Sequence, residues 1–299
     1  MPKLPISLFV NPVAGRGRAA RSIDLLRNLL YANDVDHELV VSDEAGDIER
    51  QVFQRAAAGA RQILVAGGDG SIHEAVNGLM LSGGDTALGV IPIGTGNDFA
   101  KACTIPPYWE DAVVLLADRI NSDTPDRFID VGQMNDRFFA NGAGIGFDAK
   151  VTRIAEGIRL PIGDLVYLLA VFRAMLDGVT TPELRIDYGN ESYAGPLVLA
   201  SISNGDWVGG MFNIAPMARN DDGELDLVFA KPVGSLRMMN LLPRLLQGTH
   251  LDQPEIVHKP VKRCEIVSTA PVPSQLDGEL QPMYSEFSIR VIENGLRLI

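Results

Sequence analysis

The stretch Ile63-Leu64-Val65-Ala66-Gly67-Gly68-Asp69-Gly70-Ser71 decides the fold class of the first half of the chain. Its four apolar residues are typical of a strand that is buried on both faces, and the glycines that follow end that strand. A helical pattern then runs over 71–80. A buried strand, a tight turn and a helix are the repeating unit of a parallel α/β sheet.

The same unit recurs on both sides of this stretch. Apolar runs predict strands over 6–10, 37–42 and 88–93, and helical spacing predicts helices over 18–30 and 47–58. We therefore predict an α/β domain over 1–130, with a mostly parallel sheet and helices on both faces.

After Asp130 the pattern changes to short alternating runs separated by Gly, Asn, Asp and Pro. This pattern predicts a second domain over 131–295, an antiparallel β-sandwich that one helix over 163–175 interrupts.

Composition limits the possible partners. The chain has 299 residues, 46% of them hydrophobic, and its net charge is −12, which disfavours binding to a nucleic acid backbone. Cys103 and Cys264 cannot form a disulfide framework, and the four histidines lack the spacing of zinc ligands. An anionic ligand would therefore have to be held by backbone amides and a metal ion.

The chain also gives expectations about membranes. Its longest apolar run, 165–172, is far shorter than the roughly 20 residues that span a bilayer, and no leader pattern precedes the first strand, so we expect a cytoplasmic protein. The segment 150–175 predicts either a peripheral contact with the anionic inner face of the membrane or a core helix. Its apolar residues are Ile154, Ile158, Leu160, Ile162, Leu165, Leu168, Leu169 and Phe172, and its arginines are Arg153, Arg159 and Arg173.

Three glycine-rich turns follow predicted strands and should lie along one edge of the sheet. The first is Asn11-Pro12-Val13-Ala14-Gly15-Arg16-Gly17. It is typical of a turn that holds the phosphates of a nucleoside triphosphate, although a plain tight turn is an alternative. Gly15, Gly17 and Ala20, with an acid at Asp36 or Glu38, also match a dinucleotide fingerprint.

The second turn is Gly67–Ser71, whose glycines would let the backbone approach a phosphate. Asp69 in such a turn indicates a cation, and Mg²⁺ on a nucleoside triphosphate is the simplest one. Alternatively, Asp69 forms an Asx-type turn, and Ser71 would be a good N-cap in either case. The third turn, Gly94-Thr95-Gly96-Asn97-Asp98, fits a phosphate-and-metal site or a helix cap made by Asn97 or Asp98.

Two acidic turns lie in the second half. Asn220–Glu224, followed by Asp226, predicts either a cation site or a solvated turn, because close carboxylates repel one another. Gln275–Glu279 predicts either a carboxylate that accepts the proton of a hydroxyl or an ordinary Asp-Gly hairpin turn.

Taken together, these motifs resemble the diacylglycerol kinase catalytic-domain family over essentially the whole chain, in particular the soluble bacterial lipid kinases related to sphingosine kinases. Gly67–Ser71 is similar to the GGDGT signature of that family, Asn11–Gly15 to its opening nucleotide turn and Gly94–Asp98 to its GTxND loop. Asp222–Asp226 is similar to its Mg²⁺-binding acidic turn, and Asp277–Glu279 to its late DGE motif.

The resemblance implies an ATP-dependent lipid kinase with diacylglycerol as the leading substrate and phosphatidic acid as its product. NAD kinase and a non-catalytic nucleotide-binding regulator are the alternatives. The active site is expected between the two domains, and the last strand, 296–299, is expected to return to the first. Which lipid is used stays open, and a homodimer is compatible with the sequence.

The resemblance also implies roles for individual residues. Asp69, Asp277 and Glu279 are the implied catalytic residues, with Glu279 as the proton acceptor. A structural Mg²⁺ would bind Asp222 and the carbonyls of Arg219 and Glu224, with Asp130 tying this site to the catalytic one. The implied contacts with ATP are Asn11, Pro12, Val13, Ala14, Gly15, Ser42, Gly67, Gly68, Asp69, Gly70, Ser71, Ile72, His73, Glu74, Gly94, Thr95 and Asn97. Three of them depart from the common pattern of the family: Ser42 and Ser71 stand where Thr is usual, and His73 stands where Asn is common.

Overall fold

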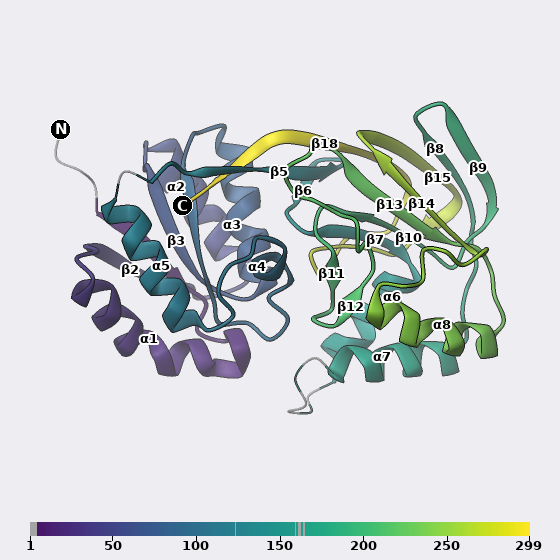
Figure 1. Ribbon diagram of the computed structural model, residues 1–299, viewed down its shortest axis with the longest axis horizontal. Coiled ribbons are helices and arrows are strands. Elements are labelled where there is room, and N and C mark those ends of the chain that lie inside the picture. The colour runs from purple at the N-terminus through teal and green to yellow at the C-terminus, as the bar shows by residue number, and fades with distance from the viewer. Residues whose placement is uncertain (1–4, 123, 159, 161–162, 164) are drawn as a thin grey trace. The chain divides into compact units, whose positions relative to one another are not determined.

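The computed structural model describes residues 5–122, 124–158, 160, 163 and 165–299 (Figure 1). The chain divides into two compact units, Met1–Ile129 with Asn294–Ile299, and Asp130–Glu293. Two residues of the segment expected to contact a membrane, Arg159 and Ile162, lie outside the described residues. Residues 1–4, where we expect no leader pattern, lie outside them as well.

The first unit is built on a parallel sheet, as predicted. Its strands run in the order β2 (His37–Val41), β1 (Ile6–Val10), β3 (Gln62–Gly67), β4 (Ala87–Pro92) and the end of β18 (Tyr284–Leu298). Leu298 pairs with Leu88 in parallel register, so the end of β18 extends this sheet.

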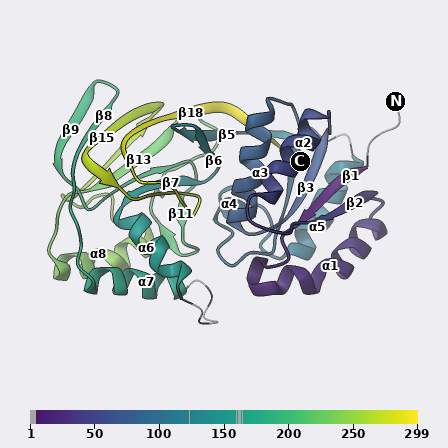
Figure 2. The same ribbon diagram turned by 180° about the vertical axis from the view of Figure 1, so that it is seen from behind.

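Helices cover both faces of this sheet, which Figure 2 shows from behind. Helices α1 (Ala14–Ala32) and α5 (Trp109–Asn121) pack through Leu26, Leu30 and Val113 on the strand residues Leu8, Leu64 and Ile91. Helices α2 (Asp47–Ala57) and α3 (Asp69–Ser82) pack together on the opposite side. The short helix α4 (Asp98–Ala102) follows β4. Because α3 and α4 begin where β3 and β4 end, their first turns share one edge of the sheet.

The second unit contains the predicted antiparallel β-sandwich. One sheet has the strand order β14 (Ile256–Val261), β13 (Leu225–Ala230), β10 (Leu199–Ser203), β7 (Gly142–Gly146), β16 (Ser274–Leu276) and β17 (Glu279–Leu280). The other contains β5 (Arg127–Met134), β6 (Arg137–Phe139), β8 (Glu183–Tyr188), β9 (Glu191–Pro196), β15 (Arg263–Val272) and β18. A short hairpin joins β11 (Trp207–Val208) and β12 (Phe212–Asn213). Ile186, Ile266 and Phe287 meet Ile202 and Phe229 in the core between the two main sheets.

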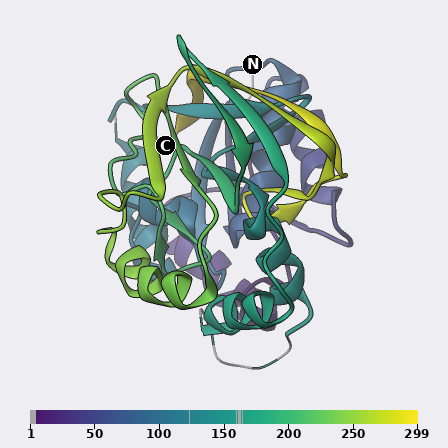
Figure 3. The same ribbon diagram turned by 90° about the vertical axis from the view of Figure 1, so that its right-hand side faces the viewer.

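The expectation of a single helix in this unit is wrong, because its described residues form α6 (Phe147–Glu156), α7 (Leu165–Leu176) and α8 (Ser235–Gln247). Pro243 lies inside α8, although proline usually kinks or ends a helix. Figures 1 and 3 show α7 and α8 side by side, and Ala170 and Leu242 belong to the apolar cluster that they share with α6. No helix among the described residues has both the length and the apolar character needed to cross a bilayer.

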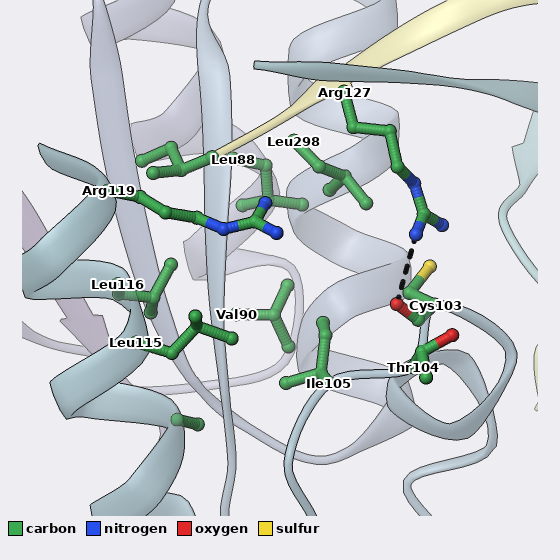
Figure 4. Close-up of a pocket in the computed structure, with 12 residues that line it drawn as sticks. Leu88, Val90, Cys103, Thr104, Ile105, Leu115, Leu116, Arg119, Arg127 and Leu298 are labelled. Carbon is green, nitrogen blue, oxygen red and sulfur yellow. Dashed lines mark hydrogen bonds between the residues drawn. The ribbon is translucent and has the colours of Figure 1, made fainter. Parts of the chain in front are cut away.

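A small pocket lies beside β4 in the first unit (Figure 4). Leu88, Val90 and Leu116 line it, together with Arg119 and Arg127. Its volume is about 40 Å³, enough for a few water molecules. Pockets that enclose a drug-sized ligand start at roughly 300 Å³, so this pocket is too small for a nucleotide.

Candidate active site

The first glycine-rich turn is tied to the second by one side chain. Asn11 follows β1, and its Nδ2 donates to Ser71 Oγ at 3.0 Å. Its Oδ1 accepts the backbone N–H of Val13 at 3.1 Å. Asn11 therefore fixes its own turn and holds it against the start of α3.

The first turn also lies against the third. Gly15, Arg16 and Gly17 have φ values of 55°, 59° and 77°, a left-handed run that disrupts the start of α1. A Cβ on Gly15 would lie 2.2 Å from the Ile93 carbonyl oxygen, so this close approach requires glycine. Arg18 then donates to the carbonyl oxygens of Ile93 at 3.1 Å and Gly94 at 2.7 Å.

The second and third turns touch through their backbones. A Cβ on Gly94 would lie 2.3 Å from the Cα of Gly68. The carbonyl oxygen of Gly67 accepts the N–H groups of Ile93 at 2.9 Å and Gly94 at 3.1 Å. The three turns that the sequence places at the carboxyl ends of β1, β3 and β4 are therefore in direct contact.

Asp69 joins the first turn of α3 to α4. Its Oδ1 accepts the backbone N–H of Phe99 at 3.1 Å, so Asp69 caps the helix that follows the third turn. The expectation that Ser71 is an N-cap is wrong, because α3 begins at Asp69 with Gly68 as its N-cap, and the Ser71 hydroxyl accepts from Asn11 instead.

Asn97 occupies the N-cap position of α4 in a left-handed conformation, without a side-chain cap. Its Nδ2 donates to the carbonyl oxygen of Gly94 at 3.2 Å. Its Oδ1 is buried and has no hydrogen-bond partner among the described residues. A buried acceptor in this position is suited to a donor or a cation supplied by a ligand.

Three of the residues implied as ATP contacts have structural partners. Both carboxylate oxygens of Glu74 cap α2, accepting from Gly46 N at 2.9 Å and Ile48 N at 3.1 Å. Ser42 is buried and its N–H donates to Val10 O. His73 is buried beside Asn77, with 3.4 Å between His73 Nε2 and Asn77 Nδ2.

In the second unit, Asp277 and Gly278 form the two-residue turn between β16 and β17, with φ values of 52° and 89°. This turn is the Asp-Gly hairpin turn, one of the two alternatives that the sequence allows for 275–279. The Asp277 carboxylate accepts three backbone N–H groups, from Ala140 at 2.9 Å, Asn141 at 2.8 Å and Gly142 at 3.0 Å. These bonds favour a positioning role for Asp277, whereas Glu279, just after the turn, is exposed.

Asn204 is a buried residue whose structural role the sequence did not reveal. Its fully buried Nδ2 donates to the carbonyl oxygens of Asp130 at 2.8 Å and Ala140 at 2.7 Å. The Asp130 carboxylate accepts Gly223 N at 2.7 Å, in the acidic turn. Asn204 thus joins that turn to the amides that hold Asp277.

The acidic turn at 220–224 offers oxygen ligands to a cation. Asp222 Oδ1 accepts Glu224 N at 3.1 Å, and Arg219 pairs with Asp221 at 3.2 Å. Lys262 Nζ donates to Glu293 Oε1 at 2.7 Å. This hydrogen bond, and then the charges of Glu293, Glu224 and Asp130, raise the pKa of Lys262. Within the described ranges no three His, Cys, Asp or Glu side chains gather as metal ligands. A site here would therefore need carbonyl oxygens beside the Asp222 carboxylate, a ligand set that suits Mg²⁺ or Ca²⁺.

Asp148, in the first turn of α6, is a second residue that the sequence did not reveal. Its Oδ2 accepts Gln275 Nε2 at 2.7 Å, and Gln275 Oε1 accepts Gly278 N at 2.7 Å. Burial raises the pKa of Asp148, and the hydrogen bond from Gln275 opposes that rise. One feature of the sequence could have indicated this contact: glycines stand at alternate positions of β7, at 142, 144 and 146. Glycine inside a strand often marks the close approach of another group.

Comparison with known proteins settles the family. Residues 5–133 match a model described as the diacylglycerol kinase catalytic domain. Residues 142–299 match one described as the YegS C-terminal NAD kinase beta sandwich-like domain. The chain belongs to the diacylglycerol kinase and YegS family of lipid kinases.

Relatives with these names cover most of the chain. A diacylglycerol kinase of Bacillus subtilis is 31% identical, over 91% of this chain and 88% of its own length. A YegS-like lipid kinase of Chromohalobacter salexigens is also 31% identical, over 88% and 84%. A solved diacylglycerol kinase from Bacillus anthracis str. Sterne shares the fold, with a TM-score of 0.76 at 24% identity over 99% of this chain and 96% of that one.

Membership of this kinase family implies the use of ATP, and the three turns fit a triphosphate. Gly15, Gly68 and Gly94 keep side-chain atoms out of the place where the turns meet. Asn97 Oδ1 and the amides at the starts of α3 and α4 provide polar groups there. All the nucleotide-binding candidates lie in the first unit, whereas Asp277, Glu279 and the acidic turn lie in the second.

We expect Glu74→Ala to lower the free energy of unfolding by about 1 kcal/mol, because it removes the acceptor that caps α2. Urea denaturation measures this change. Glu44→Ala, a nearby exposed residue of the same charge, is the control and should change it by less than about 0.5 kcal/mol. Equal stability of the two variants would contradict the capping role.

Proposed function

We propose that this protein transfers the γ-phosphate of ATP to the hydroxyl of a membrane lipid in the cytoplasm, with diacylglycerol as the leading substrate and phosphatidic acid as the product. The observation that carries the proposal is the contact of three glycine-rich turns at one sheet edge, in a chain of a lipid kinase family. The names of its relatives support the lipid class.

In the proposed reaction, bound ATP supplies the phosphoryl group, with ADP as the leaving group, and Mg²⁺ offsets the charge of the phosphates. Asn11–Gly15 would line the triphosphate, and the backbone amides of Gly15, Gly68–Ser71 and Thr95–Asn97 would orient it, since the N–H groups of Asn11, Val13, Ala14 and Gly94 already donate within the protein. Phosphoryl transfer gains most from this kind of positioning and charge neutralisation.

Asp69 and Asp98 are the proposed carboxylates for the nucleotide-bound cation. Both stand in the first turns of adjacent helices, α3 and α4, which contact each other. Asp98 also pairs with Lys101, with 3.3 Å between Oδ1 and Nζ. A second cation would bind Asp222 with the carbonyls of Arg219 and Glu224 and stabilise that turn.

Glu279 is the proposed proton acceptor. It is exposed and follows a turn that Asp277 anchors to three backbone amides, so its backbone position is well fixed. As the lipid hydroxyl oxygen bonds to the γ-phosphorus, its proton would pass to the Glu279 carboxylate. Asp277 would contribute by holding the turn.

The lipid-binding surface is proposed on α7 and α8. Exposed apolar side chains on α7 are Leu165, Leu169, Phe172 and Leu176, and those on α8 are Leu236 and Met239. Leu168 packs into the core cluster together with Ile154 and Ile158. The segment therefore serves in part as a core helix and still presents an apolar face, with the exposed Arg153 beside it for anionic lipid and with Arg173 paired to Asp177 at 3.2 Å.

Two alternatives predict different products. NAD kinase would phosphorylate NAD, and a nucleotide-binding regulator would bind ATP without turnover. NAD kinases usually carry a Ser-Ala-Gly-Gly segment in the β domain, and the comparable region of this chain reads Ser-Asn-Gly-Asp-Trp-Val-Gly-Gly over 203–210. This difference, with the names of the relatives, favours a lipid acceptor.

We expect Asp69→Asn and Glu279→Gln each to lower kcat by about 10²–10⁴-fold with the fold intact, because each removes a charge and keeps the shape. Transfer of labelled γ-phosphate to diacylglycerol, other lipid alcohols and NAD measures the activity and identifies the acceptor. Asp187→Asn, an exposed partner of Arg185 on β8, is the matched control and should keep full activity.

Labelled product from NAD alone, or ATP binding by the wild type without any product, would overturn the lipid kinase proposal. Near-normal activity of Glu279→Gln would overturn the assignment of the proton acceptor alone.

We expect Leu169→Glu with Phe172→Glu to lower binding to phosphatidylglycerol vesicles by at least about tenfold, because two apolar side chains lose their contact with the bilayer. Co-sedimentation measures the bound fraction. Val114→Glu, at an exposed apolar position on α5, is the control and should bind like the wild type. Unchanged binding of the double variant would remove α7 from the proposed surface.

A further inference from the structure

A chain of two hydrogen bonds connects α6 to the turn that precedes Glu279. Gln275 is 3% exposed, and its amide bridges Asp148 Oδ2 and the backbone N–H of Gly278, each at 2.7 Å. Gly278 is the residue immediately before Glu279. Any movement of the Gln275 amide therefore acts directly on this turn.

The orientation of the Gln275 amide depends on Asp148. The Gly278 N–H can only donate, so Gln275 must present Oε1 to it and turn Nε2 the other way. Asp148 Oδ2 accepts that Nε2–H. Without this acceptor, a buried amide would keep an unsatisfied donor, and it would gain by rotating away from Gly278.

The strand next to Gln275 leaves room for this contact. Gly144 of β7 pairs with Gln275 of β16. A Cβ on Gly144 would lie 1.7 Å from Asp148 Oδ2 and 2.7 Å from Gln275 Nε2. The contact between Asp148 and Gln275 therefore requires glycine at 144, and it is a specific feature of the packing between α6 and this sheet.

We propose that Asp148 is a positioning residue for Glu279, acting through Gln275 and Gly278 on the hairpin turn. The proposal rests on the assignment of Glu279 as the proton acceptor. Asp277 holds the turn from the side of Ala140–Gly142, and Gln275 holds it at Gly278. The bonds of Asp277 and of Gln275 together fix the backbone at Glu279. Loss of Asp148 would release only the bond between Gln275 and Gly278, so the β-sandwich should stay folded.

The variants at 148 separate hydrogen bonding from charge. Asp148→Ala removes the acceptor, and we expect it to lower kcat by about 10–100-fold, as a displacement of about 1 Å would. The KM for ATP should stay unchanged, since the nucleotide turns belong to the other unit. Asp148→Asn keeps an acceptor oxygen and should retain kcat within about threefold. Asp187→Ala, on β8, is the matched control with wild-type kinetics.

A reciprocal exchange gives the sharpest test. Gln275→Glu replaces the amide donor by a second carboxyl group at hydrogen-bond distance from Asp148. In an assay at alkaline pH, where both groups are ionised and repel, kcat should fall as in Asp148→Ala. Adding Asp148→Asn restores one donor and one acceptor with the same total charge, so the double variant should recover kcat to within about threefold. Failure of this rescue, or full activity of Gln275→Glu, would overturn the proposal.

A readout independent of activity distinguishes this proposal from the proposed function. Amide hydrogen exchange at Gly278, followed by NMR, should accelerate at least about tenfold in Asp148→Ala and remain slow in Asp148→Asn and in the double exchange. Unchanged exchange at Gly278 would overturn the positioning role even in an active lipid kinase. Wild-type protein that phosphorylates no lipid would instead overturn the proposed function.

Discussion

The contact between the glycine turns is the constraint on which the rest of the first unit depends. A Cβ on Gly94 would lie 2.3 Å from the Cα of Gly68 and collide with it, and a Cβ on Gly68 would lie only 3.0 Å from the Cα of Gly94. This approach brings the starts of α3 and α4 together, and it allows Asp69 to cap α4. The first turn of α3 then lies beside the third glycine-rich turn, and Asp69 and Asp98 stand close to where they meet.

In the second unit, hydrogen bonds to the backbone hold the turn that carries Glu279, the proposed proton acceptor. Asp277 binds three amides of the segment before β7, and Asn204 joins that segment to Asp130 and the acidic turn. These bonds fix the turn that precedes Glu279, whose own side chain is exposed.

The sequence predicted those parts of the molecule that depend on local pattern. Strand 6–10 matches β1, and the apolar run before Gly67 is β3, because strands buried on both faces are continuous apolar runs that glycine ends. The three turns could be predicted because each is a glycine-rich segment directly after such an apolar run.

Two helices were missed. The glycines of β7 suggest a loop before α6, and Pro243 suggests a break within α8. Asp148 and Asn204 were missed because their partners lie 127 and 74 residues away, and no local spacing predicts a distant hydrogen bond.

The central claim is that the three turns together form the triphosphate site, and a crystal structure with a non-hydrolysable ATP analogue and Mg²⁺ tests it most directly. The account predicts phosphate oxygens within hydrogen-bond distance of backbone amides in both 67–71 and 94–98, with the metal beside a carboxylate of Asp69 or Asp98. A nucleotide bound elsewhere, with these amides unengaged, would contradict it.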